Sequence, residues 1–236
     1  ADYQNRTLTK VTTTGTRGNI YDRDGRLLAY NELQYNITIA DNGAYDTTDS
    51  GINRRNLMLY HLAQIIEKYG YAVEGQYKLK LDEQHEFQFT TSSENEKKRF
   101  IANIRGRNVS DLSEKDFTIR AKDAFALSKS RYRFDNIKDE NGDPIVLEDE
   151  TALDMINILY TMRLTAYQRY QTTTIVKNVS KECMAEILES KGELRGVDIE
   201  NVSVRKYNYA PYLSHIVGYT SQVREDQLAE LRKTDE

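Results

Sequence analysis

Two aspartates near the start of the chain are the first candidates for acid–base chemistry. Asp22 and Asp24 stand in the stretch GTRGNIYDRDGRLLAY, residues 15–30. A general acid must hold its proton at neutral pH, whereas the nearby Arg17 and Arg23 favour ionised carboxylates. An Asp-x-Asp-Gly tetrapeptide between apolar residues is also a tight-turn signal, in which a carboxylate accepts backbone N–H bonds. We therefore interpret the stretch as a structural β-hairpin rather than as a catalytic loop.

Other patterns for catalysis or metal binding are incomplete. Cys183 is the only cysteine and stands in a stretch with amphipathic helical spacing, which is typical of a small buried apolar residue. The histidines have no Cys or His at metal-ligand spacing. A calcium-loop pattern that begins at Asp139 has Pro144 where the sharp turn needs Gly. The chain also has no G-x-S-x-G, P-loop or G-x-G-x-x-G motif. We predict no catalytic residue, no cofactor and no metal site.

The composition indicates a polar globular protein of one large domain or two small ones. The 236 residues are 39% hydrophobic and 30% charged, with a formal net charge of −4. This weak acidity argues against nucleic acid as the main partner, because phosphate binding needs a basic surface. The chain contains no run of about 18 apolar residues, which is the length that a membrane-spanning helix needs. The chain opens at ADYQNRTLTK without Met, which suggests an excised piece of a larger protein.

Hydrophobic periodicity and turn signals predict a mixed fold. Strands or hairpins are expected at 19–29, 35–40, 78–90, 172–179 and 196–207. Helices are expected at 52–69, 94–105, 113–129, 151–167, 181–190, 211–218 and 224–232, with a loop over 133–150. Ser113 with Asp116 resembles a capping pair, and Ser180 is expected to cap the helix that follows it. Because strands lie at both ends and helices crowd the middle, the predicted class is α+β.

Two segments resemble class B penicillin-binding proteins. The first resembles the signature R-G-x-I-Y-D-R-x-G-x-x-L-A of that family. It matches at Arg17, Gly18, Tyr21, Asp22, Arg23 and Gly25. The second, VRKYNYAPYLSHIVGYTSQVREDQL (204–228), resembles the family segment R-x-Y-P-x-G…A-H-x-x-G-Y. It matches at Arg205, Tyr207, His215, Gly218 and Tyr219, with Asn208 in place of the usual Pro and Ala210 in place of the usual Gly.

The resemblance implies a non-catalytic pedestal, also called a dimerisation domain, over residues 1–236. Its base would comprise segments of about 15–40 and 172–222, with terminal hairpins and strands, and its helical head about 41–171. The full proteins of the family are serine D,D-transpeptidases that cross-link peptidoglycan and bind penicillin. We expect their catalytic module and its S-x-x-K nucleophile motif to be absent, and Ser93-Glu94-Asn95 and Lys233-Thr234-Asp235 only imitate its S-x-N and K-T-G motifs.

The resemblance also implies a location and partners. The parent would be held at the extracytoplasmic face of the plasma membrane by an N-terminal transmembrane helix that is absent here. The implied partners are its own transpeptidase domain, a membrane glycosyltransferase of the SEDS family and a second copy of the chain. We expect Arg17, Asp22, Arg23 and Arg205 to form a polar network that fastens the two motif segments together.

Two alternatives stay open from the sequence. The chain could be a stand-alone extracytoplasmic binding module, in which the polar middle, rich in tyrosine, forms a ligand face. It could also be an independent enzyme. Covalent labelling by a fluorescent penicillin would favour the second alternative. The sequence does not distinguish a parent that serves cell elongation from one that serves division.

Overall fold

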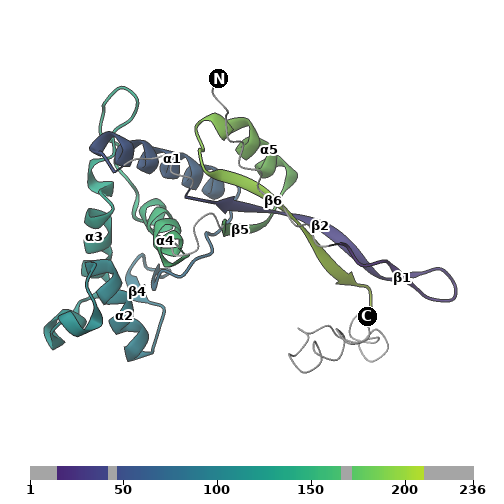
Figure 1. Ribbon diagram of the computed structural model, residues 1–236, viewed down its shortest axis with the longest axis horizontal. Coiled ribbons are helices and arrows are strands. Elements are labelled where there is room, and N and C mark those ends of the chain that lie inside the picture. Colours follow the sequence, from purple (N-terminus) through teal and green to yellow (C-terminus); the bar gives the residue numbers. More distant parts are fainter. Residues whose placement is uncertain (1–14, 42–46, 166–171, 210–236) are drawn as a thin grey trace, which may run out of the picture. The chain divides into compact units, whose positions relative to one another are not determined.

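The computed structural model describes residues 15–41, 47–165 and 172–209 (Figure 1). The chain divides into two compact units. Unit 1 comprises Ala1–Leu33 and Ser203–Glu236, and unit 2 comprises Gln34–Val202. Both boundaries fall inside long strands, whereas the predicted base and head divide near residues 40 and 172. The predicted helices at 211–218 and 224–232 lie outside the described residues.

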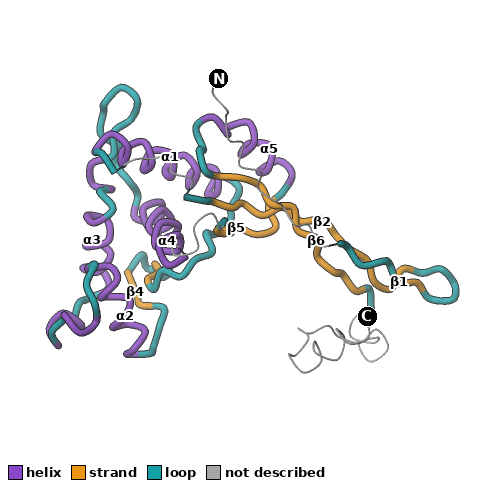
Figure 2. Tube along the Cα trace, viewed as in Figure 1, coloured by secondary structure: helices purple, strands orange, loops and turns teal. Residues whose placement is uncertain are grey.

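Strand β2 (Leu27–Ile39) is the centre of the larger sheet, as Figure 2 shows. It pairs antiparallel with β1 (Ile20–Tyr21) and, further along, with β5 (Thr173–Val179). On its other side it pairs with β6 (Val197–Tyr207). The two strands expected at 27–29 and 35–40 are thus parts of one strand of 13 residues. This mixture of strands and helices confirms the α+β class.

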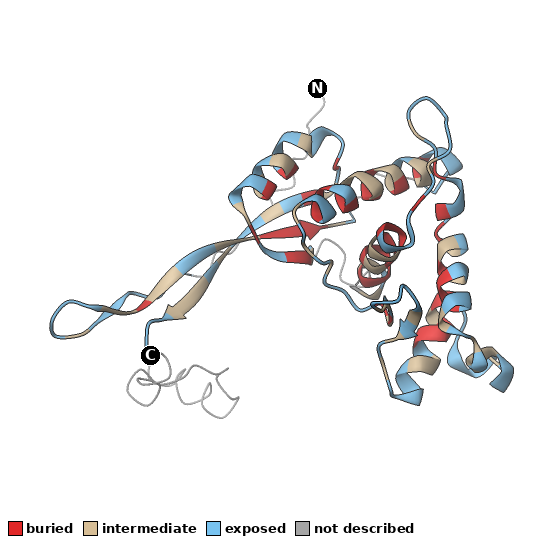
Figure 3. Ribbon diagram, turned by 180° about the vertical axis from the view of Figure 1, so that it is seen from behind, coloured by how far each residue is buried: buried red, intermediate tan, exposed pale blue. Residues whose placement is uncertain are grey.

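Two helices form the main apolar layer of unit 2. Helix α1 (Asp49–Lys68) is capped at its N-terminus by Thr48, whose hydroxyl accepts the Gly51 N–H at 3.1 Å. Helix α4 (Asp149–Thr165) packs against it. Apolar residues at helical spacing on α1 are buried, and the same is true of α4 (Figure 3). The fully buried side chains of the two helices include Leu59, Leu62, Ile66, Met155 and Ile156.

A small hairpin and two helices complete the middle of the chain. Strands β3 (Leu79–Leu81) and β4 (Phe87–Phe89) pair antiparallel, as predicted. Helices α2 (Glu94–Arg105) and α3 (Ala121–Arg131) pack beside them. The ring of Phe87 stacks on Phe125 with centroids 4.1 Å apart, and the ring of Tyr77 meets Phe100 edge to face. These contacts between aromatic rings join the hairpin region to both helices.

The prediction of one helix over 113–129 is wrong for the first part of that range. The structure has a 3-10 turn, η2 (Glu114–Thr118), and α3 begins only at Ala121. Ile119 and Arg120 between them have extended backbone angles, which end one element before the next begins. The predicted capping pair is confirmed, because the Asp116 carboxylate accepts the Ser113 N–H at 2.9 Å. Three more 3-10 turns are η1 (Val109–Asp111), η3 (Phe134–Asn136) and η4 (Ser190–Gly192).

Helix α5 (Lys181–Glu189) follows β5 directly and is capped as predicted. The Ser180 hydroxyl accepts the Cys183 N–H at 3.2 Å. Among the described residues, no helix has both the length and the apolar character that a membrane crossing needs.

Candidate functional site

The predicted hairpin of unit 1 is closed by one aspartate. The Asp22 Oδ1 accepts the backbone N–H groups of Asp24 at 2.9 Å and Arg26 at 2.8 Å. The Asp22 N–H donates to the Arg26 carbonyl at 2.9 Å, and Gly25 adopts a φ of +78° that favours glycine. The Asp22 carboxylate therefore holds the turn between β1 and β2, as the sequence suggested for this tetrapeptide.

One arginine joins segments that lie far apart in the sequence. Arg205 on β6 donates from Nη1 to the Gly18 carbonyl at 2.8 Å and to the Asn31 Oδ1 at 3.3 Å. The Asn31 amide in turn donates to the Arg17 carbonyl. Since Arg205, Asn31 and the Arg17–Gly18 backbone come from three segments, these bonds fix β6, β2 and the approach to β1 to one another.

Asn208 adds two further bonds just after β6. Its backbone N–H donates to the Leu28 carbonyl at 2.8 Å, and its side-chain amide donates to the Leu27 carbonyl at 2.9 Å. A proline at this position, as in the family segment, has no N–H and could make neither bond. We call Gly18, Asn31, Arg205 and Asn208 the clasp, because together they tie the two motif segments.

The sequence missed two members of the clasp. Asn31 and Asn208 carry side-chain amides that can donate and accept at once, which suits them to bridge backbone groups. The available signal was their position, since Asn31 stands just after the first motif and Asn208 lies within the second. Their partners lie on other segments, however, and spacing along the chain does not reveal such pairs.

The remaining predicted site residues are arranged differently. Of the expected network of Arg17, Asp22, Arg23 and Arg205, only Arg205 bridges distant segments in the described part of the chain. Arg17 contributes its carbonyl, and its side chain has no hydrogen bond or ion pair there. The Arg23 Nε lies 3.8 Å from the Asp24 carboxylate in an exposed pair. His215, Gly218 and Tyr219 lie outside the described residues.

Large apolar side chains remain exposed around the clasp. Eight such residues are exposed in the described part of the chain, and five of them belong to unit 1. These five are Ile20, Tyr21, Leu33, Tyr207 and Tyr209. The ring of Tyr207 also lies 5.9 Å from the Arg205 guanidinium carbon. Unit 1 is therefore richer in exposed aromatic and aliphatic surface than its size alone explains.

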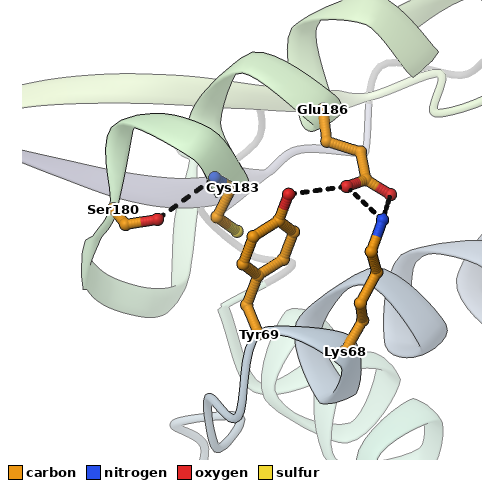
Figure 4. A network of polar contacts seen from close by, with 5 residues as sticks. All are labelled: Lys68, Tyr69, Ser180, Cys183 and Glu186. Carbon is orange, nitrogen blue, oxygen red and sulfur yellow. Dashed lines mark hydrogen bonds and ion pairs between the residues drawn. The ribbon is translucent and has the colours of Figure 1, made fainter.

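Cys183 lies beside a polar group that joins α1 to α5 (Figure 4). The Tyr69 hydroxyl donates to the Glu186 Oε2 at 2.7 Å, and the Lys68 Nζ lies 2.7 Å from the same oxygen. The hydrogen bond to Glu186 raises the pKa of Tyr69 to about 12. The thiol of Cys183 is fully buried, and this burial raises its pKa to about 11. Such a thiol is a poor nucleophile, so the structural interpretation of Cys183 is favoured.

The expectation that the chain has no S-x-x-K is wrong, because one such spacing occurs at Ser203-Val204-Arg205-Lys206. The structure places it in β6, where residues three apart point to opposite faces of the strand. The Lys206 Nζ lies 3.2 Å from the Glu32 carboxylate in an ion pair. Ser203 and Lys206 therefore do not form a nucleophile and base pair. Within the described ranges, no cluster of three His, Cys, Asp or Glu residues could hold a metal ion.

Comparison with protein families gives a match over almost the whole chain. A family model described as "Penicillin-binding Protein dimerisation domain" matches residues 12–235. No curated protein matches the chain.

Two solved structures of penicillin-binding protein 2B from Streptococcus pneumoniae are also similar to the chain. That of strain 5204 is 18% identical with a TM-score of 0.39, and the match covers 97% of this chain and 32% of that chain. That of strain R6 is 18% identical with a TM-score of 0.43, and the match covers 95% and 31%. The chain thus spans about a third of the length of these proteins.

Proposed function

The chain belongs to the penicillin-binding protein dimerisation domain family, and from this premise we propose that it is the non-catalytic pedestal of a class B penicillin-binding protein. In this role it positions a D,D-transpeptidase for the cross-linking of peptidoglycan. The chemistry belongs to the parent, a serine D,D-transpeptidase that binds penicillin, and not to this chain.

The clasp is the observation that carries the proposal. A pedestal must transmit a fixed geometry from one end of its chain to the other, and the clasp ties the two motif segments by hydrogen bonds. The donors are Arg205 and Asn208, and their acceptors include the carbonyls of Gly18, Leu27 and Leu28. Arginine suits this task because its charged guanidinium makes several directed bonds at once.

The exposed apolar residues of unit 1 support a docking surface. We propose that the parent's own transpeptidase domain covers some of them, since exposed aromatic side chains are typical of contact surfaces. A SEDS-family glycosyltransferase in the membrane and a second copy of the chain are further proposed partners. The parent would carry the chain on the extracytoplasmic face of the plasma membrane, anchored by an N-terminal helix.

The alternative of a stand-alone binding module finds less support. It relied on tyrosines in the middle of the chain as a ligand face. Tyr77, Tyr132 and Tyr160 in this region are buried, with exposed fractions of 5–7%. These three side chains build the core of unit 2, so they offer no face to a ligand.

Two measurements on the full-length parent test the proposal. Fluorescent penicillin should label the parent covalently and should leave the 236-residue chain unlabelled. In the parent, the double variant Arg205→Gln/Asn208→Ala should keep penicillin labelling, because the active site is elsewhere, but should lower the yield of peptidoglycan cross-links several-fold.

The exposed hairpin arginine provides a matched control. Arg26→Gln removes the same charge from unit 1, but the side chain of Arg26 has no hydrogen bond or ion pair among the described residues. It should therefore leave cross-linking unchanged. Labelling of the isolated chain would refute the non-catalytic assignment. Normal cross-linking by the double variant would refute the positioning role of the clasp.

A further inference from the structure

A pocket rich in arginine lies in unit 2, between α2 and α3, which pack against each other (Figure 1). Its volume is about 270 Å³. It is lined by Ile104, Arg105, Arg107, Leu127, Ser130 and Arg131. Three of these six side chains carry a positive charge, and none of the six residues belongs to the clasp.

The end of α2 brings two of the arginines to the pocket. Gly106 stops the helix with a φ of +69°, and the Arg107 N–H donates back to the Ala102 carbonyl at 3.0 Å. A Cβ at position 106 would lie 2.3 Å from the Arg131 Nη1, so the guanidinium of Arg131 lies directly against the glycine. The same Nη1 donates to the Ile104 carbonyl at 3.3 Å. The tight turn thus brings arginines from both helices to the lining of one pocket.

The protein itself leaves much of this charge without a partner. The Arg105 Nη1 lies 3.4 Å from the Asp116 Oδ1, and the Arg105 Nε is buried with no hydrogen-bond partner in the described structure. The other oxygen of Asp116 is already bound by the N–H and the hydroxyl of Ser113. For the Arg107 guanidinium, the described residues provide no hydrogen bond or ion pair. A buried donor without an acceptor is costly.

The electrostatic environment agrees with a local excess of positive charge. Burial lowers the pKa of Arg131, and the like charge of Arg163 lowers it further. The acids nearby are Asp111 and Asp116. Hydrogen bonds from Ser110 and Asn108 lower the pKa of Asp111, so it is ionised, but it is engaged in its own turn. Three arginines line the pocket, and a fourth, Arg163, repels the charge of one of them, Arg131.

We propose that this pocket binds the phosphate group of a small molecule. Guanidinium groups match the oxygens of phosphate, and a pocket lined by three arginines suits a tetrahedral dianion better than a planar carboxylate. The Ser130 hydroxyl is a further donor. The pocket holds several times the roughly 30 Å³ share of one water. An organic substituent on the phosphate could therefore lie against Ile104 and Leu127.

Isothermal titration calorimetry of the full chain tests this assignment. The ligands are inorganic phosphate, phenyl phosphate and benzoate, at low salt. The second pKa of a phosphate monoester is about 6, and the pH is set well above that value so that inorganic phosphate, which loses its second proton later, is also mainly a dianion. Both phosphates should bind, and benzoate should bind at least about tenfold more weakly. Tighter binding of phenyl phosphate assigns the site to phosphate esters, and equal binding of the two assigns it to free phosphate. Benzoate that binds as well as phosphate, or no binding of either phosphate up to millimolar concentrations, would overturn the proposal.

Two arginine variants separate a built site from general attraction. Arg107→Gln should weaken phosphate binding by about tenfold or more, because it removes charged hydrogen bonds. Its thermal unfolding should be nearly unchanged, since the exposed guanidinium makes no hydrogen bond or ion pair with the described residues and acts on Asp111 and Asp116 only through a screened field. Arg99→Gln removes the same charge from an exposed position on α2 outside the pocket and should change the affinity less than about twofold, as a surface charge acts only through a screened field. Unaltered binding by Arg107→Gln, or an equal loss in both variants, would refute the site.

Discussion

At the scale of single residues, Asp154 on α4 occupies a place that disfavours its charge. Burial, followed by repulsion from Glu67 and Glu150, raises the pKa of its carboxyl from 3.8 to about 6. Between these two values the folded chain binds a proton that the unfolded chain has released. The contribution of Asp154 to the free energy of unfolding therefore falls as the pH rises through this window, and it stays low above pH 6.

The variant Asp154→Asn should accordingly stabilise the protein in a pH-dependent way. At pH 8 we expect a gain of about 1–3 kcal/mol, the upper value being the full pKa difference converted to free energy. At pH 4 the wild-type carboxyl is mostly protonated and the gain should nearly vanish. Urea unfolding at the two pH values measures this difference. The exposed Asp135→Asn is the control and should show no such contrast, and an equal gain for Asp154→Asn at both pH values would contradict the argument.

At the scale of elements, the extended segment before β3 is held by the side chains of α4. The Gln76 N–H donates to the Thr161 hydroxyl at 2.9 Å, and the Tyr77 N–H donates to the Asn157 Oδ1 at 3.1 Å. These bonds require close approach, and a Cβ on Gly75 would lie 2.0 Å from the Asn157 Oδ1. Glycine at position 75 is therefore a packing requirement of the contact with α4.

Gly75→Ala should push this segment away from α4 and weaken both bonds. We expect a loss of about 1–3 kcal/mol in the free energy of unfolding, as for other overpacked sites. The control is Gly192→Ala, where a Cβ meets nothing within 4 Å. Denaturant unfolding of the two variants should separate them clearly. A loss for Gly192→Ala as large as that for Gly75→Ala would show that a general effect of glycine replacement is being measured.

The elements also show what the sequence could and could not predict. Apolar periodicity located α1, α2, α4 and α5, because each buries one stripe of side chains against the core. Ser180 and Ser113 were recognisable as caps because their partners stand three residues away. Only part of the clasp could be predicted from the sequence, since the hydrogen bond from Arg205 to the Gly18 carbonyl joins residues that lie far apart along the chain. Tertiary hydrogen bonds to backbone carbonyls leave no periodic trace, and for the same reason the arginine pocket was not predicted.

At the scale of the whole molecule, the two units differ in how they are stabilised. The apolar core cluster consists of residues from unit 2, beginning at Ile37 and ending at Val197. In the described part of unit 1 only Ala29 is a buried apolar residue. The strand pairs between β2 and β5, from Tyr35 to Ile39, also belong wholly to unit 2. Burial of apolar surface is the main favourable term in folding, so unit 2 should carry most of the stability.

A fragment of residues 34–202 should therefore fold without unit 1. We expect a single cooperative urea transition with a midpoint close to that of the full chain, because the fragment keeps the complete core cluster. The fragment should also bind phosphate as the full chain does, since all residues of the arginine pocket lie within it. A fragment with helical circular dichroism but no cooperative transition would show that the hairpin and clasp are needed to order the core. In that case the clasp would stabilise the whole fold, and the double variant Arg205→Gln/Asn208→Ala would lower the unfolding midpoint of the full chain.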